Sequence, residues 1–367
     1  MKKRFLISGG GTGGHIFPAL AIANQIKKEN PEAEILFIGA QNKMEMKRVP
    51  EAGYHIEGLD VYGIKRDFSL SGIISNLKLP FVLMKTMRRA KKIISEFKPD
   101  VAIGVGGFAS GPALQSAIAL GVPALIQEQN SYPGVTNKIL SQKVKKICVA
   151  YDGLERYFPA EKIVKTGNPI RAEILNLKRK NEEAYQFFGF SPDKKTVLVM
   201  GGSLGARSMN TCMHNHIDTI AQTGVQVLWQ TGEAFYNEIP AEEIQQKYPQ
   251  IKIVPFIKNM DFAYSISDYI VSRAGALAIA ELTIVGAPVI LVPFPYASED
   301  HQTKNAAALA NENAAILIPD KEASEKMVPE LLKLIEDEER AQIMAENIKK
   351  FALPDAIHKI VKEVMDL

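Results

Sequence analysis

The sequence predicts an α/β protein with two parallel-sheet domains. Its runs of Val, Ile and Leu without polar alternation are typical of strands buried on both faces of a sheet. These runs alternate with helix-forming stretches, and that pattern gives a parallel sheet. Three of the runs end in glycine-rich turns, and a length of 367 residues favours two domains over one.

The first half alternates strand and helix signals up to a break near Gly167 and Pro169. A polar stretch follows at 179–184, so we predict one domain at 1–164 and a second at 165–349. The predicted elements of the first half are the strands Phe5–Ser8, Ile35–Ile38, Val101–Val105 and Ala124–Ile126 and the helix Pro18–Asn30.

The second half repeats the plan and ends in an amphipathic helix at about residues 350–367. Ile357, Ile360, Val361 and Val364 fall on one stripe of that helix, and we expect it to pack back on the first domain. The predicted strands of this half are Val197–Met200, Val225–Gln230, Ile251–Val254, Tyr269–Val271 and Val289–Val292.

Bulk composition excludes several classes of protein. A net charge of +3 is too balanced for a nucleic-acid binder. Cys148 and Cys212 make neither a disulfide framework nor a zinc set, and they fit a reducing cytosol. The uncharged stretch 101–127 is long enough to span a membrane, but its glycines and prolines argue against a transmembrane helix.

The glycine-rich turns carry most of the chemical information. Glycine lets a ligand approach the backbone closely, and the helix that follows adds partial positive charge at its N-terminus. Together these features predict phosphate binding. The three segments are FLISGGGTGGHIFPA at 5–19, VAIGVGGFASGPA at 101–113 and VLVMGGSLGARSMN at 197–210.

The first turn also fits the dinucleotide fingerprint, with glycines at Gly9, Gly11 and Gly14. That fingerprint needs an acidic residue at the end of the next strand to hold the ribose, and 37–41 contains none. We therefore disfavour nicotinamide binding. His15 closes the turn, either as a cap or core residue or as a base that accepts a proton from an attacking hydroxyl.

Two carboxylates also stand where ligands gather. Glu128 ends a predicted strand among amides that could read sugar hydroxyls, unless the segment is a solvated turn. Glu281 lies early in the helix after Gly275, where it either holds a ribose or complements the helix dipole. The pair His214 and His216 lacks carboxylate or cysteine partners, so no metal site is predicted.

Seven segments together resemble one family in order, spacing and residue type. They are GGGTGGHIFPA, GVGGFASGP, the EQN at 128–130, the GNPIR ending at Arg171, GGSLGAR at 201–207, RAGALAIAE at 273–281 and HQTKNA at 301–306. Nearly the whole chain thus resembles the MurG family, GT-B glycosyltransferases of peptidoglycan synthesis. The resemblance implies two Rossmann-like domains with a cleft between them.

The activity that this resemblance implies is an inverting, metal-independent transfer of GlcNAc without a cofactor. The donor is UDP-GlcNAc, the acceptor is the C4 hydroxyl of MurNAc in lipid I (undecaprenyl-pyrophosphoryl-MurNAc-pentapeptide), and the product is lipid II. Two alternatives stay open: a UDP-GlcNAc 2-epimerase of the same fold, and a non-catalytic nucleotide-sugar-binding partner that docks on membranes. The order of the motifs argues against the first, and the full set of donor residues argues against the second.

The resemblance also implies a role for each site residue. Those near the donor sugar and the acceptor phosphate are Thr12, Gly13 and Gly14. Those that contact the donor are Asn130, Arg171, Ser203, Phe256 and Ile257 (beside uracil), Ala276, Leu277, Ala278, Ile279 and Ala280 (along the pyrophosphate), Glu281 (on the ribose) and Gln302 (on GlcNAc). Ala278 departs from relatives that carry threonine there. For the catalytic base, His15 is our first candidate and Glu128 the second.

A basic and apolar segment at 68–92 predicts membrane contact. Its last third holds Lys85, Arg88, Arg89, Lys91 and Lys92 without an acidic residue. It is either a core helix with a solvated basic face or a surface that docks on anionic lipid. An acceptor with a lipid tail favours docking at the cytoplasmic face of the membrane, where other cell-wall synthesis enzymes are expected partners.

Overall fold

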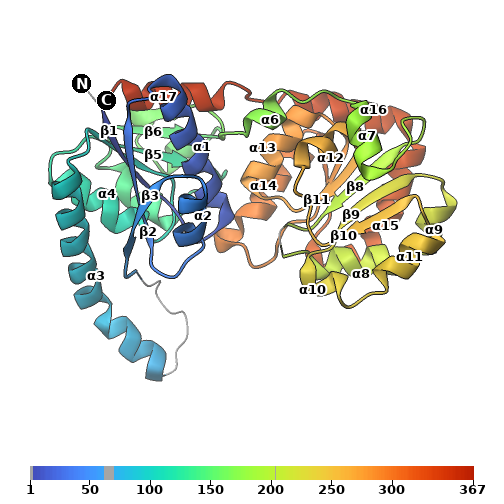
Figure 1. The fold of residues 1–367 in the computed structure, drawn as a ribbon, viewed down its shortest axis with the longest axis horizontal. Coiled ribbons are helices and arrows are strands. Elements are labelled where there is room, and N and C mark those ends of the chain that lie inside the picture. The colour runs from blue at the N-terminus through green and yellow to red at the C-terminus, as the bar shows by residue number, and fades with distance from the viewer. Residues whose placement is uncertain (1–2, 62–69, 203) are drawn as a thin grey trace. The chain divides into compact units, whose positions relative to one another are not determined.

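The computed structural model describes residues 3–61, 70–202 and 204–367, and the chain divides into two compact units. The first comprises Met1–Ile170 and Asp355–Leu367, and the second comprises Arg171–Pro354. Each unit has its own parallel sheet flanked by helices (Figure 1). The two sheets are the Rossmann-like pair predicted from the sequence.

The first unit has a seven-stranded sheet in the order β3-β2-β1-β4-β5-β6-β7. The strands are β1 (Arg4–Ser8), β2 (Glu34–Ala40), β3 (His55–Leu59), β4 (Val101–Gly104), β5 (Ala124–Glu128), β6 (Lys146–Val149) and β7 (Ile163–Lys165). The helices are α1 (Gly13–Glu29), α2 (Glu45–Glu51), α3 (Leu70–Phe97), α4 (Ser110–Ala119), α5 (Val135–Ser141), the short η1 (Leu154–Arg156) and η2 (Ala160–Lys162), and α17 (Ala356–Met365).

The last helix, α17, belongs to this first unit. Its side chains Ile360, Val361 and Val364 are fully buried and share a core with Ile22 and Ile26 of α1. The chain is not helical across 351–355, so the helix begins at Ala356 rather than near 350. A regular apolar stripe gives α17 the single buried face that this packing requires.

The second unit has a six-stranded sheet in the order β10-β9-β8-β11-β12-β13. The strands are β8 (Thr196–Met200), β9 (Gln226–Gln230), β10 (Ile251–Val254), β11 (Tyr269–Ser272), β12 (Val289–Leu291) and β13 (Ile316–Leu317). The helices are α6 (Ala172–Leu175), α7 (Glu182–Phe188), α8 (Arg207–Asn215), α9 (Ile217–Gln222), α10 (Glu233–Tyr236), α11 (Ala241–Lys247), α12 (Met260–Ile266), α13 (Ala276–Val285), the short η3 (Ser298–Asp300), α14 (His301–Ala310), α15 (Asp320–Glu336) and α16 (Glu338–Lys349).

Each sheet has one point where the strand order reverses. We call the carboxyl ends of β1 and β4 the first switch point, and those of β8 and β11 the second switch point. Open α/β sheets bind ligands at such points, because the loops after the two strands diverge to opposite faces. All three glycine-rich turns follow strands that end at these two points.

Four strands are missing from the sequence prediction: β3, β6, β7 and β13. Three of them lie at sheet edges, and β13 has only two residues. Edge strands need no continuous apolar run, since one side stays open to solvent. β6 lies inside the sheet, but its four residues, KICV, are too few to form a signal.

Helix α3 contains most of the predicted membrane segment. Phe68 and Ser69 lie outside the described residues, as do the side chains up to Phe81. Beyond them, Ala90 and Ile94 are buried against the sheet, whereas the basic side chains at 88, 89, 91 and 92 are exposed. No helix within the described ranges is long and apolar enough to span a membrane.

Candidate active site

The first two glycine-rich turns contact each other at the first switch point. A side chain at Gly9 would overlap Val105, and one at Gly107 would overlap the backbone of Gly10. Gly107 also has a φ of +87°, a conformation that favours glycine. The turns therefore pack backbone against backbone, and larger residues do not fit.

His15 lies in the first turn of α1, against the second glycine-rich turn. A Cβ at Gly106 would be 2.9 Å from Nε2 of His15, so the ring packs on that backbone. The carbonyl of Thr12 accepts the His15 N–H at 3.1 Å, and Thr12 Oγ1 is 3.4 Å from His15 Nδ1. Gly13 and Gly14 begin α1, so their N–H groups have no carbonyl one turn earlier in the helix to accept them, and the first turn of α1 contains no acidic residue. Thr12, Gly13, Gly14 and His15 thus gather at one edge of the sheet.

Glu128 is buried at the end of β5 and accepts four hydrogen bonds. Oε1 accepts from the backbone and side-chain nitrogens of Asn130 at 3.0 and 3.2 Å. Oε2 accepts from the Gly134 N–H at 3.1 Å and from Asn137 Nδ2 at 2.9 Å. Burial raises the pKa of Glu128 above its ordinary value, and the four donors act in the opposite direction. With both oxygens occupied by hydrogen bonds, this carboxylate orders the loop that holds Asn130.

The third glycine-rich turn is fixed by Gln230, which ends β9. Its Nε2 donates to the Gly202 carbonyl at 2.8 Å, and its Oε1 accepts the Ile257 N–H at 3.1 Å. One buried amide therefore joins the turn to the loop predicted to meet uracil, where Phe256 is exposed and Ile257 buried. Ser203, predicted to contact the donor, lies outside the described residues. Gln230 was not predicted as a site residue, although a polar residue at the end of an apolar strand is the same signal that identified Glu128.

Glu281 forms an ion pair with Arg171 in the second unit. Nε and Nη2 of Arg171 both lie 2.8 Å from Oε1, and the Tyr264 hydroxyl donates to Oε2 at 3.1 Å. Burial raises the pKa of Glu281, and the guanidinium of Arg171 acts in the opposite direction. Burial also raises the pKa of Tyr264, whose hydroxyl stays protonated and donates. The sequence analysis named both ion-pair partners but not Tyr264.

The N-terminus of α13 lies at the second switch point, where the chain leaves β11. Gly275 is its extended N-cap and accepts the Ile279 N–H at 2.9 Å. The first turn contains no acidic residue, and Ala276, Leu277, Ala278 and Ala280 provide apolar, mostly small side chains. Such a helix end attracts an anion through its N–H groups and its dipole. Nearby in sequence, the Gln302 side-chain oxygen accepts the Phe294 N–H at 2.9 Å, which fixes the orientation of that amide.

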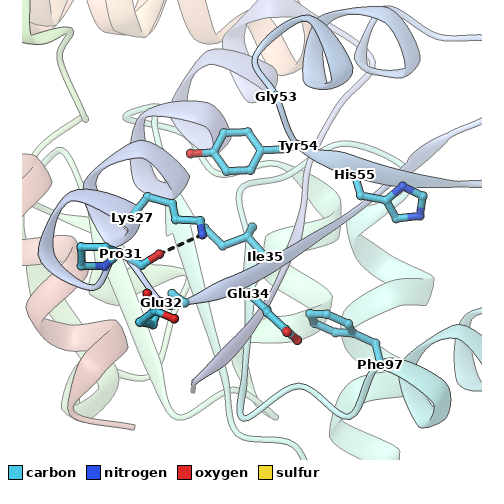
Figure 2. A pocket seen from close by; sticks show the side chains of 10 residues that line it. Lys27, Pro31, Glu32, Glu34, Ile35, Gly53, Tyr54, His55 and Phe97 are labelled. Atoms are coloured by element: carbon cyan, nitrogen blue, oxygen red, sulfur yellow. Dashed lines mark hydrogen bonds between the residues drawn. The ribbon is translucent and has the colours of Figure 1, made fainter. Parts of the chain in front are cut away.

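A pocket of about 380 Å³ opens at the opposite edge of the first sheet (Figure 2). Polar side chains of this pocket form hydrogen bonds with neighbouring residues. Lys27 donates to the Pro31 carbonyl, and the Tyr54 hydroxyl donates to the Asn24 side chain. Glu34 pairs with Arg4. None of the predicted site residues lines this pocket. Across the described residues, no group of three His, Cys, Asp or Glu could hold a metal ion.

Comparison with known proteins identifies the family of this chain. Residues 5–149 match the glycosyltransferase family 28 N-terminal domain, and residues 196–360 match its C-terminal domain. The chain is 51% identical over 366 residues to a Parabacteroides distasonis protein, covering 100% of this chain and 98% of that one. That protein is named UDP-N-acetylglucosamine--N-acetylmuramyl-(pentapeptide) pyrophosphoryl-undecaprenol N-acetylglucosamine transferase. The chain belongs to this transferase family.

Further relatives agree. A Cytophaga hutchinsonii protein of the same name is 52% identical, covering 99% of this chain and 96% of that one. The crystal structure of Acinetobacter baumannii MurG matches with a TM-score of 0.79 and 29% identity, over 100% of both chains. The UDP-GlcNAc 2-epimerase of Neisseria meningitidis matches over 100% of both chains with a TM-score of 0.65 but only 15% identity, which shows a shared fold alone. The predicted GT-B glycosyltransferase fold is confirmed.

Proposed function

We propose that this chain transfers GlcNAc from UDP-GlcNAc to the C4 hydroxyl of MurNAc in lipid I, giving lipid II. Relatives named for this donor and acceptor are 51% and 52% identical over nearly the full chain. The observation that carries the proposal is the contact of Glu281, on the helix α13 that begins at the second switch point, with Arg171 and with Tyr264 of α12. In this group the Glu281 carboxylate can accept hydrogen bonds from a ribose, and the Arg171 guanidinium can interact with a diphosphate.

In the donor half of the reaction, UDP must leave with the electron pair of the bond to C1 of GlcNAc. The helix N-terminus lined by Ala276 to Ala280 and the Arg171 guanidinium stabilise the negative charge that develops on the pyrophosphate. Such donors are already oriented, so they cost no reorganisation during the reaction. Glu281 accepts hydrogen bonds from the ribose hydroxyls, Phe256 and Ile257 meet the uracil, and Gln302 reads the GlcNAc hydroxyls.

In the acceptor half, the C4 oxygen of MurNAc forms the new bond to C1 from the side opposite UDP, which inverts the configuration there. His15 takes the proton of that hydroxyl. Thr12, Gly13 and Gly14 contact the acceptor phosphate and donor sugar at the N-terminus of α1, and Asn130 contacts the donor. Glu128 stays a second candidate for the base, although the four hydrogen bonds to its oxygens favour His15.

The test of this function is an assay of the purified protein with UDP-GlcNAc and a soluble lipid I analogue. We expect UDP release that depends on the acceptor, together with a disaccharide product. Conversion of UDP-GlcNAc without acceptor would instead identify an epimerase. Donor binding without either reaction would identify a non-catalytic binding protein.

The first unit also docks on the cytoplasmic face of the membrane through the segment 68–92. Exposed basic side chains on the second half of α3 support this, because each Lys or Arg near an anionic surface contributes about 1 kcal/mol. Docking holds the glycine-rich turns near a lipid-anchored acceptor. Association with other cell-wall synthesis enzymes stays a prediction.

Vesicle co-sedimentation tests the docking proposal. We expect binding to anionic vesicles that weakens as salt rises, since salt screens charge attraction. Replacement of Ile74, Leu77 and Phe81 by serine should reduce vesicle binding and leave UDP affinity unchanged. No binding at low salt, or unchanged binding by the triple variant, would exclude this segment from membrane contact.

A further inference from the structure

Glu45 is a fully buried carboxylate behind the first glycine-rich turn. It stands at the start of α2 and is 0% exposed. Oε2 accepts the Gly11 N–H at 2.9 Å, and Oε1 accepts the Ala40 N–H at 3.0 Å. A side chain at Gly10 would overlap the carboxylate, and a Cβ at Gly39 would lie 2.6 Å from Glu45 Cγ. Within the described parts of the chain, no ion pair involves Glu45.

A carboxylate removed from water carries a desolvation penalty unless hydrogen-bond donors replace the water. At Glu45 the donors are the Gly11 and Ala40 N–H groups, so burial of this side chain depends on the shape of the turn. The position is also unusual, because a glycine-rich turn of this kind offers its N–H groups to a phosphate. Here the Gly11 N–H already has an internal anion as its acceptor, so the turn is held in one shape before any ligand arrives.

The shape of that turn determines where His15 lies. Gly11, with a φ of +90°, leads directly into Thr12, the N-cap of α1, whose carbonyl accepts the His15 N–H. On the other side, the His15 ring packs on Gly106. The first turn is therefore held between the Glu45 carboxylate and the second glycine-rich turn, and His15 is fixed at its end.

We propose that Glu45 is a positioning residue that holds the first glycine-rich turn so that His15 meets the acceptor hydroxyl. The inference rests on the proposed transferase function. Glutamine at position 45 keeps the size of the side chain, but its one oxygen accepts only one of the two N–H groups, and its NH2 group opposes the other.

Glu45→Gln should lower kcat for GlcNAc transfer about 10²-fold, the typical cost of displacing a reacting group by about 1 Å. The Kd for UDP, measured by calorimetry, should not change. Glu51→Gln is the matched control, because Glu51 lies on the same helix but is partly exposed and pairs with Arg48. We expect wild-type kinetics from that control.

A double-mutant cycle decides whether Glu45 acts through His15. In a His15→Ala background, Glu45→Gln should cost less than about twofold further, because residues that act as a unit are not additive. An equal loss in both backgrounds, a fully active His15→Ala variant, or wild-type kinetics in Glu45→Gln would overturn the proposal.

A readout without turnover separates this inference from the proposed function. In the 15N-labelled protein, the Gly11 amide should shift and exchange faster with solvent in Glu45→Gln but not in Glu51→Gln. An unchanged Gly11 amide would overturn the positioning role. Absence of transferase activity in the wild-type protein would instead overturn the function on which it rests.

Discussion

The two switch points share one topology and differ in what holds their buried carboxylates. Beside the first, the carboxylates of Glu45 and Glu128 accept backbone N–H groups, and no ion pair among the described residues involves either of them. At the second, the carboxylate of Glu281 is paired with the guanidinium of Arg171. The first therefore uses amide donors where the second uses a cationic side chain.

This difference teaches how one sheet architecture can serve two kinds of substrate. Positive charge and open N–H groups suit the pyrophosphate of a nucleotide sugar. Carboxylates that accept backbone N–H groups fix the shape of the neighbouring loops, which suits the orientation of the reacting hydroxyl in the proposed acceptor site.

The sharpest test of the first switch point is His15→Ala. We expect kcat to fall about 10²–10⁴-fold, the usual contribution of a general base, while UDP still binds through the second unit. Single-turnover transfer and calorimetry with UDP measure the two effects. A nearly neutral His15→Ala combined with a strongly impaired Glu128→Ala would exchange the roles of these residues.

At the second switch point, Glu281→Ala should raise the donor KM and lower kcat/KM about tenfold to hundredfold. A hydrogen bond to a charged group contributes about 1.5–3 kcal/mol, which corresponds to that range. Tyr264→Phe is the matched variant, since it keeps the carboxylate and removes one donor to it, and its loss should be smaller. Wild-type donor kinetics in a folded Glu281→Ala protein would show that the ribose is held elsewhere.

Glu128→Gln tests whether that carboxylate orders its loop. The glutamine NH2 group would face N–H donors, and one unsatisfied buried donor costs about 1–3 kcal/mol of unfolding free energy. Urea denaturation measures the loss. A stability equal to that of the wild-type protein would contradict the loop-ordering role.

The same pair of proteins also tests the pKa of Glu128. Burial raises the pKa of Glu128 in the folded state above the ordinary 4.5. At a pH between 4.5 and the folded-state pKa, Glu128 is therefore protonated in the folded protein but ionised in the unfolded chain. The stability contributed by Glu128 therefore falls as pH rises from about 4.5 through the folded-state pKa. The wild-type unfolding free energy minus that of Glu128→Gln should fall over this window. A difference that rises with pH would mean that the four hydrogen bonds outweigh burial.

The smallest expected effect is that of a chelator. Arg171 and the N-terminus of α13 supply the positive charge at the second switch point, so EDTA should leave the transfer rate unchanged. Loss of turnover in EDTA that Mg²⁺ or Mn²⁺ restores would show that these groups do not suffice.

Much of the fold could be predicted from local patterns. Strands such as β1, β8 and β12 contain continuous apolar runs because helices cover both faces of the sheet, and each run is complete within a few residues. Glycine-rich turns can likewise be recognised from the sequence, because close contact between backbones excludes residues with side chains. Edge strands such as β7 give no such signal, since solvent on one side removes the need for a continuous apolar run.

The candidate site was predictable as a set of positions but not as a set of contacts. The sequence predicts different roles for Glu128 and Glu281 but does not show which groups contact either carboxylate. In the structure, Glu128 has four amide donors whereas Glu281 has a guanidinium and a phenol. Gln230 and Tyr264 could not be predicted as site residues, because their roles depend on hydrogen bonds to other residues of the folded protein.

The sequence alone determined the two parallel-sheet units, the three glycine-rich turns, the family and the candidate residues, because these depend on local composition and motif order. Only the tertiary structure decided which charged side chains form hydrogen bonds and ion pairs with which partners. Glu45 and Gly11 are 34 residues apart, and Arg171 and Glu281 are 110 apart. Hydrogen bonds and ion pairs act over a few ångströms in space, so their partners are fixed only when the folded sheets bring distant loops to the same edge.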